Sequence, residues 1–211
     1  MKKLTEDLER ISANNTLMAE KQQQVFESGV AIGQEQGKQA QYDEWWDEFQ
    51  DYGNRTWYWG AFAGPGWTDK TLKPKHPIRI DGTIGYTFRS CEATVLPRVE
   101  MISTDCSNLY YGATKARKIH LVLLNGGKNF TAAFSSCSNL ENVTIEGLIG
   151  ANISFSSSSK LTDASVQNII DHLADVTGQT SLKITFHNTV GSKLTEAQKE
   201  QITAKNWTLA Y

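Results

Sequence analysis

Apolar and polar residues alternate in short runs along the second half of the chain, and each run predicts a strand. The clearest example is Phe134-Ser-Ser-Cys-Ser-Asn-Leu-Glu-Asn-Val-Thr-Ile145. Its Val143 and Ile145 lie on one face of a strand, and Leu140 turns inward just before them. Neither these residue types nor their spacing supplies a nucleophile, a base or a metal ligand, so we expect the segment to be scaffold.

The same arrangement recurs along the chain. Ala116-x-x-Ile119-x-Leu121 precedes Leu140-x-x-Val143-x-Ile145 by 24 residues, and Cys106-Ser-Asn-Leu109 matches Cys137-Ser-Asn-Leu140 at a distance of 31. Distances of about 20 to 30 residues are typical of a leucine-rich repeat solenoid rather than a closed barrel. Weaker strands are predicted at residues 153–155, 182–186 and 207–211. The residues expected to form the repeat core are Ile119, Leu121, Phe134, Cys137, Leu140, Val143, Ile145, Ile184, Phe186 and Leu209.

Two helices are predicted between the last strands. The apolar face of the first consists of Val166, Ile169, Ile170 and Leu173. Thr162 is its expected N-cap, and Gly178 is expected just after its end. The second helix opens with a capping box, Thr195-Glu-Ala-Gln198, and closes at Asn206, a residue that tolerates a left-handed backbone.

A heptad pattern of apolar positions predicts a helix at the start of the chain. Its seam reads Leu4, Leu8, Ile11, Asn15, Met18, Gln22 and Val25. Such a seam joins copies of a helix, and polar residues within it usually set the register and the oligomer state. We expect a homodimer or a homotrimer, between which the sequence does not decide. The alternative is a single amphipathic helix that packs on its own domain.

Aromatic residues are concentrated between this helix and the strands. A stripe at helical spacing is followed by a segment rich in Gly and Pro, with one short strand predicted at residues 78–80. The aromatic residues expected to act at this junction are Trp45, Trp46, Phe49, Trp57, Tyr58, Trp59 and Trp67. We expect them to form a hydrophobic plug, and the alternative is a platform that stacks on sugar rings.

These patterns together predict an α+β fold. Residues 1–52 form a helical segment for oligomerisation or attachment, which can be a coiled coil, and residues 53–85 form the aromatic junction. Residues 86–211 form a short, irregular leucine-rich repeat solenoid of stacked strands with two C-terminal helices.

Composition argues against several classes of function, including nucleic-acid binding and membrane insertion. The 211 residues carry a net charge of −2 without a stripe of Lys and Arg, which argues against nucleic acid as a partner. We expect no membrane insertion, because no run approaches about 18 apolar residues. Acidic residues follow Lys2 and Lys3 at once, so we expect no signal peptide and synthesis in the cytoplasm. Three cysteines cannot all pair, and buried thiols are the favoured interpretation.

Groups suited to catalysis or metal binding are sparse. The histidines, at positions 76, 120, 172 and 187, lack the spacing of zinc ligands. Asp171, His172 and Asp175 fall on one predicted helix, where solvation is the usual role of such residues. Gly126-Gly127-Lys128 lacks the other residues of a phosphate-binding loop and is interpreted as a turn. We therefore expect no catalytic residue, no cofactor and no metal.

Residues 134–145 resemble the leucine-rich repeats of the bacterial surface antigen (BspA-like) type, in which an aromatic residue, a cysteine and a Ser-Leu pair precede an alternating strand. Leu161-Thr-Asp-Ala-Ser-Val-Gln-Asn-Ile-Ile170 and Leu194-Thr-Glu-Ala-Gln-Lys199 look like the terminal repeats of such proteins in phages and prophages of gut Firmicutes. The resemblance covers roughly residues 88–211. Less specifically, residues 44–50 look like the N-terminal portion of the same phage-associated proteins.

The resemblance implies a non-enzymatic virion component, of the tail-fibre or head-fibre kind, whose repeats mediate adhesion or receptor binding at the host surface. The implied partners are further copies of the chain, other virion proteins, and a host-surface glycan or protein. The alternatives are a decoration or assembly protein that binds only virion subunits, and a bacterial surface adhesin-like protein. An enzyme acting on glycans would need a pair of carboxylates in a cleft.

Overall fold

The structure, a computed structural model, describes Lys21 and residues 62–72, 74, 77–81 and 86–211. The chain divides into two compact units, residues 1–41 and 42–211, and the elements below belong to the second. The predicted seam from Leu4 to Val25 and the aromatic residues from Trp45 to Trp59 lie outside the described residues.

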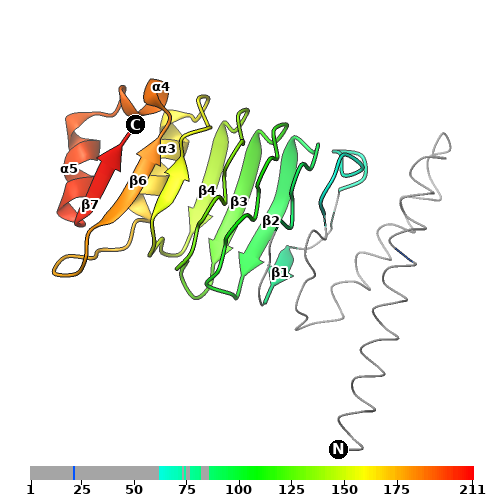
Figure 1. The fold of residues 1–211 in the computed structure, drawn as a ribbon, viewed down its shortest axis with the longest axis horizontal. Helices are drawn as coiled ribbons and strands as arrows, with labels where there is room; N and C mark the ends of the chain where they lie inside the picture. Colours follow the sequence, from blue (N-terminus) through cyan, green and yellow to red (C-terminus); the bar gives the residue numbers. More distant parts are fainter. Residues whose placement is uncertain (1–20, 22–61, 73, 75–76, 82–85) are drawn as a thin grey trace, which may run out of the picture. The chain divides into compact units, whose positions relative to one another are not determined.

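Two parallel sheets form the body of the protein (Figure 1). The first contains β1 (Ile78–Ile80), β2 (Val95–Met101), β3 (Lys118–Leu123) and β4 (Asn142–Glu146) in chain order. The second contains β5 (Ile153–Phe155), β6 (Leu182–Phe186) and β7 (Trp207–Ala210). The helices α3 (Asp163–Asp171), α4 (Asn188–Gly191) and α5 (Glu196–Ala204) lie between the later strands in the sequence, so the fold belongs to the α+β class.

The predicted distance of 24 residues between neighbouring strands is confirmed by the register of β3 and β4. Ile119 lies beside Val143 and Leu121 beside Ile145, and all four side chains are buried. Because side chains alternate along a strand, the residues between them point to the outer face. Residues 78–80 also form the predicted strand.

A ladder of stacked aromatic rings forms the centre of the body. Ring centroids are 5.2 Å apart for Phe62 and Phe88, 5.4 Å for Phe88 and Tyr110, 5.7 Å for Tyr110 and Phe134, 4.5 Å for Phe134 and Phe155, and 6.2 Å for Phe155 and Phe186. The planes of neighbouring rings differ by 17° to 27°, and all six side chains are buried. Each winding of the chain therefore contributes one ring to a continuous core.

The turns that carry the first rings share one backbone conformation. A residue with positive φ stands two positions before and two positions after Phe88, Tyr110 and Phe134: Tyr86 and Ser90, Asn108 and Gly112, and Ala132 and Ser136. The Phe88 N–H donates to Leu109 O (2.9 Å), and the Tyr110 N–H donates to Ala133 O (2.9 Å). These bonds align each turn with the next.

This alignment shows that the match of Cys106-Ser-Asn-Leu109 with Cys137-Ser-Asn-Leu140 was misleading. Cys106 precedes its ring, Tyr110, whereas Cys137 follows its ring, Phe134. The residue equivalent to Cys137 is Ala113. Ring stacking and the hydrogen bonds between turns define this equivalence, and identity of residue type does not.

Helix α3 takes the place of a next strand at the edge of β4. The N–H of Val143 donates to Ser165 Oγ (2.9 Å), and the N–H of Ile145 donates to Asn168 Oδ1 (2.7 Å). Edge N–H groups of a sheet need such partners when they are covered. Strand pairing continues instead from β5, whose Phe155 extends the ring ladder.

Replacing Asn168 by alanine is expected to lower the free energy of unfolding by about 1 to 3 kcal/mol, because the Ile145 N–H loses its acceptor beneath the helix. Urea denaturation followed by circular dichroism measures the change. Asn142→Ala, an exposed position on β4, is the matched control and should stay within about 0.5 kcal/mol of the parent. Equal losses in the two variants would contradict the edge-capping role.

The predicted start of α3 is confirmed, but the predicted end is wrong. Thr162 is the N-cap, and its side chain accepts from the Ser165 N–H. The helix ends at Asp171, well before Gly178, because the following backbone pairs with Ile149: the Ile149 N–H donates to His172 O (2.8 Å). The capping box of α5 and the positive φ of Asn206 are both confirmed.

Candidate functional site

Charged side chains occupy the outward positions of the first sheet. Arg79 of β1 pairs with Glu100 of β2 (3.4 Å), and Arg98 of β2 pairs with both Glu100 (3.4 Å) and Glu146 of β4 (3.1 Å). His120 Nε2 of β3 lies 2.5 Å from Glu146 Oε1. We call these five residues the sheet-face cluster. They join four strands across a single surface.

A hydrogen bond is the main influence on the pKa of Glu146 in this cluster. The pKa of Glu146 is lowered, chiefly by the hydrogen bond from His120; burial opposes this effect, and the nearby charges of Arg98, His120 and His172 add smaller lowering effects. The side chains of His120 and Glu146 are 29% and 45% exposed, so solvent weakens the pairing. The cluster therefore forms a polar surface of mixed charge with its side chains held in place.

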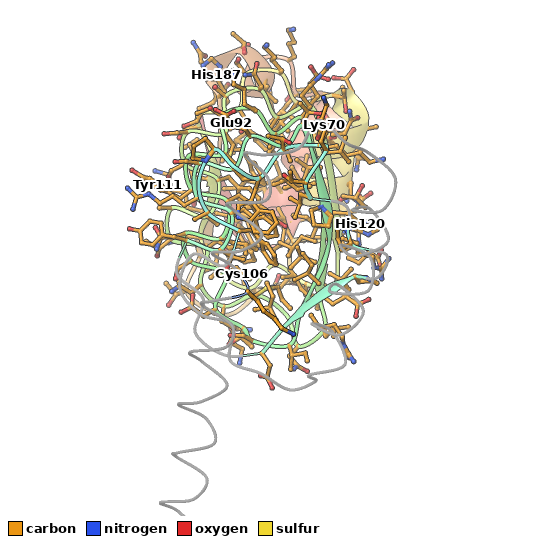
Figure 2. All side chains as sticks on the ribbon, turned by 90° about the vertical axis from the view of Figure 1, so that its right-hand side faces the viewer. Lys70, Glu92, Cys106, Tyr111, His120 and His187 are labelled. Carbon is orange, nitrogen blue, oxygen red and sulfur yellow. The ribbon has the colours of Figure 1, made fainter. Side chains whose placement is uncertain are left out.

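A second cluster lies on the turns that carry the aromatic ladder. The guanidinium carbon of Arg89 lies 5.0 Å from the ring centre of Tyr86 and 5.9 Å from that of Tyr111. The two tyrosine rings meet edge to face at 5.5 Å. We call these three residues the turn-face cluster. Figure 2 shows Tyr111 and His120 on opposite sides of the body, so the two clusters occupy different faces.

The three cysteines are free and buried, as the sequence predicted. Burial raises the pKa of Cys91 to about 11 and the pKa values of Cys106 and Cys137 to about 12. The Cys137 thiol donates to Tyr110 O (3.2 Å). Because the thiolate is the reactive form, these side chains act as packing groups at neutral pH.

The ring ladder contains one hydroxyl, and this group has no hydrogen-bond partner among the described residues. It belongs to Tyr110, whose side chain is fully buried. Burial raises the pKa of this phenol well above its usual value, so the group is neutral. An unpaired buried hydroxyl costs roughly 1 to 3 kcal/mol of stability.

Replacing Tyr110 by phenylalanine is therefore expected to raise the free energy of unfolding by about 1 kcal/mol, since the ring remains and the unpaired hydroxyl is removed. Thermal and urea unfolding measure the gain. Tyr111→Phe, which alters a partly exposed hydroxyl on the next residue, should change stability by less than about 0.5 kcal/mol. A loss of stability in the Tyr110 variant would show that its hydroxyl has a partner.

Apart from His76, which lies outside the described residues, the remaining polar residues singled out in the sequence have structural roles. Asp171 is the last residue of α3 and Asp175 lies beyond it, so the predicted shared helix for Asp171, His172 and Asp175 is wrong. Hydrogen bonds from Gln201 and Gln167 lower the pKa of Asp171. His172 Nδ1 bonds Asn168 O (2.8 Å).

Two further residues, His187 and Gly126, also have local roles. His187 accepts the Thr189 N–H at the start of α4. Gly126, with φ of +72°, lies in the predicted turn after β3.

The predicted core residues contribute no side chain to either cluster. Ile119, Leu121, Phe134, Cys137, Leu140, Val143, Ile145, Ile184 and Phe186 are all buried. Leu209 is partly exposed because β7 is the edge strand of its sheet. Trp67, from the predicted junction, meets Phe62 edge to face at 5.3 Å.

Sequence reasoning missed both clusters. The signal for the sheet-face cluster was present: His120 is the polar residue between the buried Ile119 and Leu121. The turn-face cluster could have been found from the residues that directly follow the ladder rings, because Arg89 follows Phe88 and Tyr111 follows Tyr110.

A hollow of about 220 Å³ lies beside the first turns of α3 and α5. It is lined by Ser159, Lys160, Leu161, Asp163, Val166, Thr189, Val190, Lys193, Leu194 and Gln198. Lys160 Nζ is turned to Asn139 Oδ1 (2.6 Å). Across the described part of the chain, no group of three or more His, Cys, Asp or Glu residues is arranged to hold a metal ion.

Comparison with known proteins gives no match to a family model, to a curated protein or to a solved structure. Among the described residues, no helix is both long enough and apolar enough to cross a membrane.

Proposed function

We propose that the protein is a non-enzymatic recognition component of a phage virion, of the tail-fibre or head-fibre kind. Its body is a short, irregular leucine-rich repeat solenoid that binds a ligand on the host surface. The repeated winding of the chain supports this proposal: parallel strands pair side by side, and one aromatic ring per winding fills the core. Stacked repeats of this kind present extended surfaces for binding.

The observation that carries the proposal is the sheet-face cluster. Arg98, His120 and Glu146 lie on three neighbouring strands, where a rigid backbone holds their side chains. Ordered polar groups on strands suit selective binding, because little conformational entropy is lost when a ligand arrives. The N-terminal helix would carry this body as a homodimer or homotrimer attached to other virion proteins.

Binding of the full-length protein to cells of gut Firmicutes, and to their purified wall polysaccharide, tests the proposal. We expect saturable binding at micromolar concentration to at least one strain. Arg98→Ala combined with His120→Ala should weaken it by about tenfold, while the exposed control Lys115→Ala should bind as the parent does. Absence of binding to every strain tested, together with binding to purified virion subunits, would instead support a decoration or assembly role.

Oligomerisation is a separate part of the proposal. Light scattering is expected to give a dimer or a trimer for the intact protein and a monomer for a chain that lacks residues 1–40. Monomers in both samples would exclude the oligomerising helix.

A further inference from the structure

Arg89 differs from the other described arginines in its partners. Arg79 and Arg98 pair with glutamates on the sheet face, and Arg117 Nη2 lies 2.8 Å from Glu141 Oε2. The Arg89 guanidinium instead lies against the rings of Tyr86 and Tyr111, and it forms no hydrogen bond or ion pair with another described residue. Arg89 is exposed, so its N–H groups are available to a ligand.

The contact with the rings holds Arg89 in place without using its N–H groups. Distances of 5.0 Å and 5.9 Å from the guanidinium carbon to the ring centres are typical of cation–π contacts. A guanidinium keeps its fork of donors while it contacts an aromatic ring, and this fork matches the two oxygens of a carboxylate or a phosphate. The turn-face cluster is thus ordered before a ligand arrives.

The backbone beneath the cluster is also fixed. The Arg89 N–H donates to Tyr86 O (3.1 Å), and the Ser90 N–H donates to Tyr111 O (3.2 Å). Phe88 and Tyr110, which adjoin Arg89 and Tyr111, are buried in the ring ladder. The relative positions of the three side chains therefore follow from the core and not from a free loop.

Polar side chains continue along the same line. The residues that directly follow the next two ladder rings are Ser135 and Ser156, so hydroxyl groups succeed Arg89 and Tyr111 on the following turns. A tyrosine ring offers a flat apolar surface and a hydroxyl, and serine offers a second hydroxyl. These groups suit the C–H faces and hydroxyls of a sugar or another polyol.

We propose that the turn-face cluster binds an acidic glycan or polyol chain. Arg89 takes the phosphate or carboxylate in a two-pronged contact, and Tyr111 with Tyr86 packs against the adjoining ring or carbon chain. The inference rests on the proposed function for placing this ligand at a host surface. It adds the chemical class of the ligand and a second binding face, opposite the sheet-face cluster.

A single arginine favours this ligand over a nucleic acid. Single-stranded nucleic acids bind along grooves that carry several cations, because each phosphate adds a charge. Here the following turns provide Ser135 and Ser156, and the whole chain has a net charge of −2. The site therefore suits a chain in which neutral hydroxylated units surround each bound acid group.

Titration of the full-length protein with four soluble polymers tests this inference. The probes are poly(glycerol phosphate), polygalacturonate, neutral dextran and single-stranded oligothymidylate, and calorimetry measures the affinity. We expect binding to poly(glycerol phosphate) or to polygalacturonate, which distinguishes a phosphate from a carboxylate source, and no binding to dextran. Binding to neither anionic polymer, or equal binding to oligothymidylate, would overturn the inference.

Variants give the residue-level test. Arg89→Gln is expected to lower the affinity for the bound polymer about tenfold or more, and Arg89→Lys to recover only part of it, because lysine lacks the planar fork. Arg117→Gln, an exposed arginine away from the cluster, should bind as the parent does. Unchanged binding by Arg89→Gln, or an equal loss in Arg117→Gln, would overturn the inference. Equal melting temperatures establish that the variants are folded.

The two proposals fail in different ways. Cell binding that Arg89→Gln leaves intact would refute the acidic-glycan site and support the sheet face as the recognition surface. Polymer binding that depends on Arg89, in a protein that binds no cell, would support the site and refute the host-surface function.

Discussion

Replacing Phe134 by alanine is expected to lower the free energy of unfolding by about 3 to 5 kcal/mol. Phe134 stacks on Tyr110 on one side and on Phe155 on the other, and the 4.5 Å centroid distance to Phe155 is the shortest in the ladder. Its side chain is 1% exposed, so truncation leaves a cavity between two turns as well as removing apolar contacts. Urea denaturation followed by fluorescence and circular dichroism measures the loss.

Phe134→Leu is the matched control for ring stacking. Leucine fills much of the space, so its cost should be clearly smaller, about 1 to 2 kcal/mol, and should represent lost ring contacts and shape. Exposed Ser138→Ala, on the turn that follows, should have little effect. A loss below about 1.5 kcal/mol for Phe134→Ala would mean that the ladder is not the main source of cohesion between turns.

Replacing Gly147 by alanine is expected to have a comparably large effect, about 2 to 5 kcal/mol. Gly147 follows β4 with φ of +84°, and an added Cβ would overlap the carbonyl oxygen of Leu123 at the end of β3. Two costs add: roughly 1 to 2 kcal/mol for a left-handed L-residue, and about 1 to 3 kcal/mol for forcing a methyl group into packed backbone. Chemical denaturation of the variant measures the sum.

Gly178→Ala separates these two costs. Gly178 has nearly the same φ, +79°, but no atom lies within 4 Å of the position of an added Cβ. Its alanine variant should therefore show only the backbone cost of about 1 to 2 kcal/mol. If the two glycine variants lose equal stability, the close approach of the β4 turn to β3 contributes nothing.

Sequence patterns predicted the elements well where local chemistry decides them. The alternation around Ile119 and Val143 predicted both the strands and their register, since burial of one face forbids a shift by one residue. Thr162 and Thr195 marked the starts of α3 and α5, because a side-chain oxygen satisfies N–H groups of the first turn wherever the helix lies.

Prediction failed where the outcome depends on contacts between windings. Gly178 is a good residue for ending a helix, but α3 ends earlier, because the backbone after Asp171 pairs with Ile149. The repeated Cys-Ser-Asn-Leu segments fall at different places in their windings, because the segments are 31 residues apart whereas the stacked rings Tyr110 and Phe134 are 24 residues apart. The local sequence carries no information on which backbone segment pairs after α3, or on which residues of neighbouring windings are equivalent.

The two candidate surfaces also combine features that the local sequence predicts with features that depend on contacts between windings. His120 could be recognised as an outward residue from its neighbours alone, but its pairing with Glu146 required the register of β3 and β4. Arg89 and Tyr111 each follow a ladder ring in the sequence, but Tyr86 does not, and no sequence pattern shows that the three side chains meet. They meet because the turns around Phe88 and Tyr110 stack directly on each other.

The amino-acid sequence by itself thus determined which faces of the strands are buried, where the C-terminal helices begin and which cysteines serve as packing groups. These properties depend on side-chain polarity and on hydrogen bonds within a few residues. Only the tertiary structure decided that the rings form one ladder, that α3 closes the edge of β4 and that Arg89 lies over two tyrosines. Those features depend on which windings become neighbours. Side-chain packing and the pairing of edge N–H groups decide this, and both join residues that are 20 or more positions apart in the sequence.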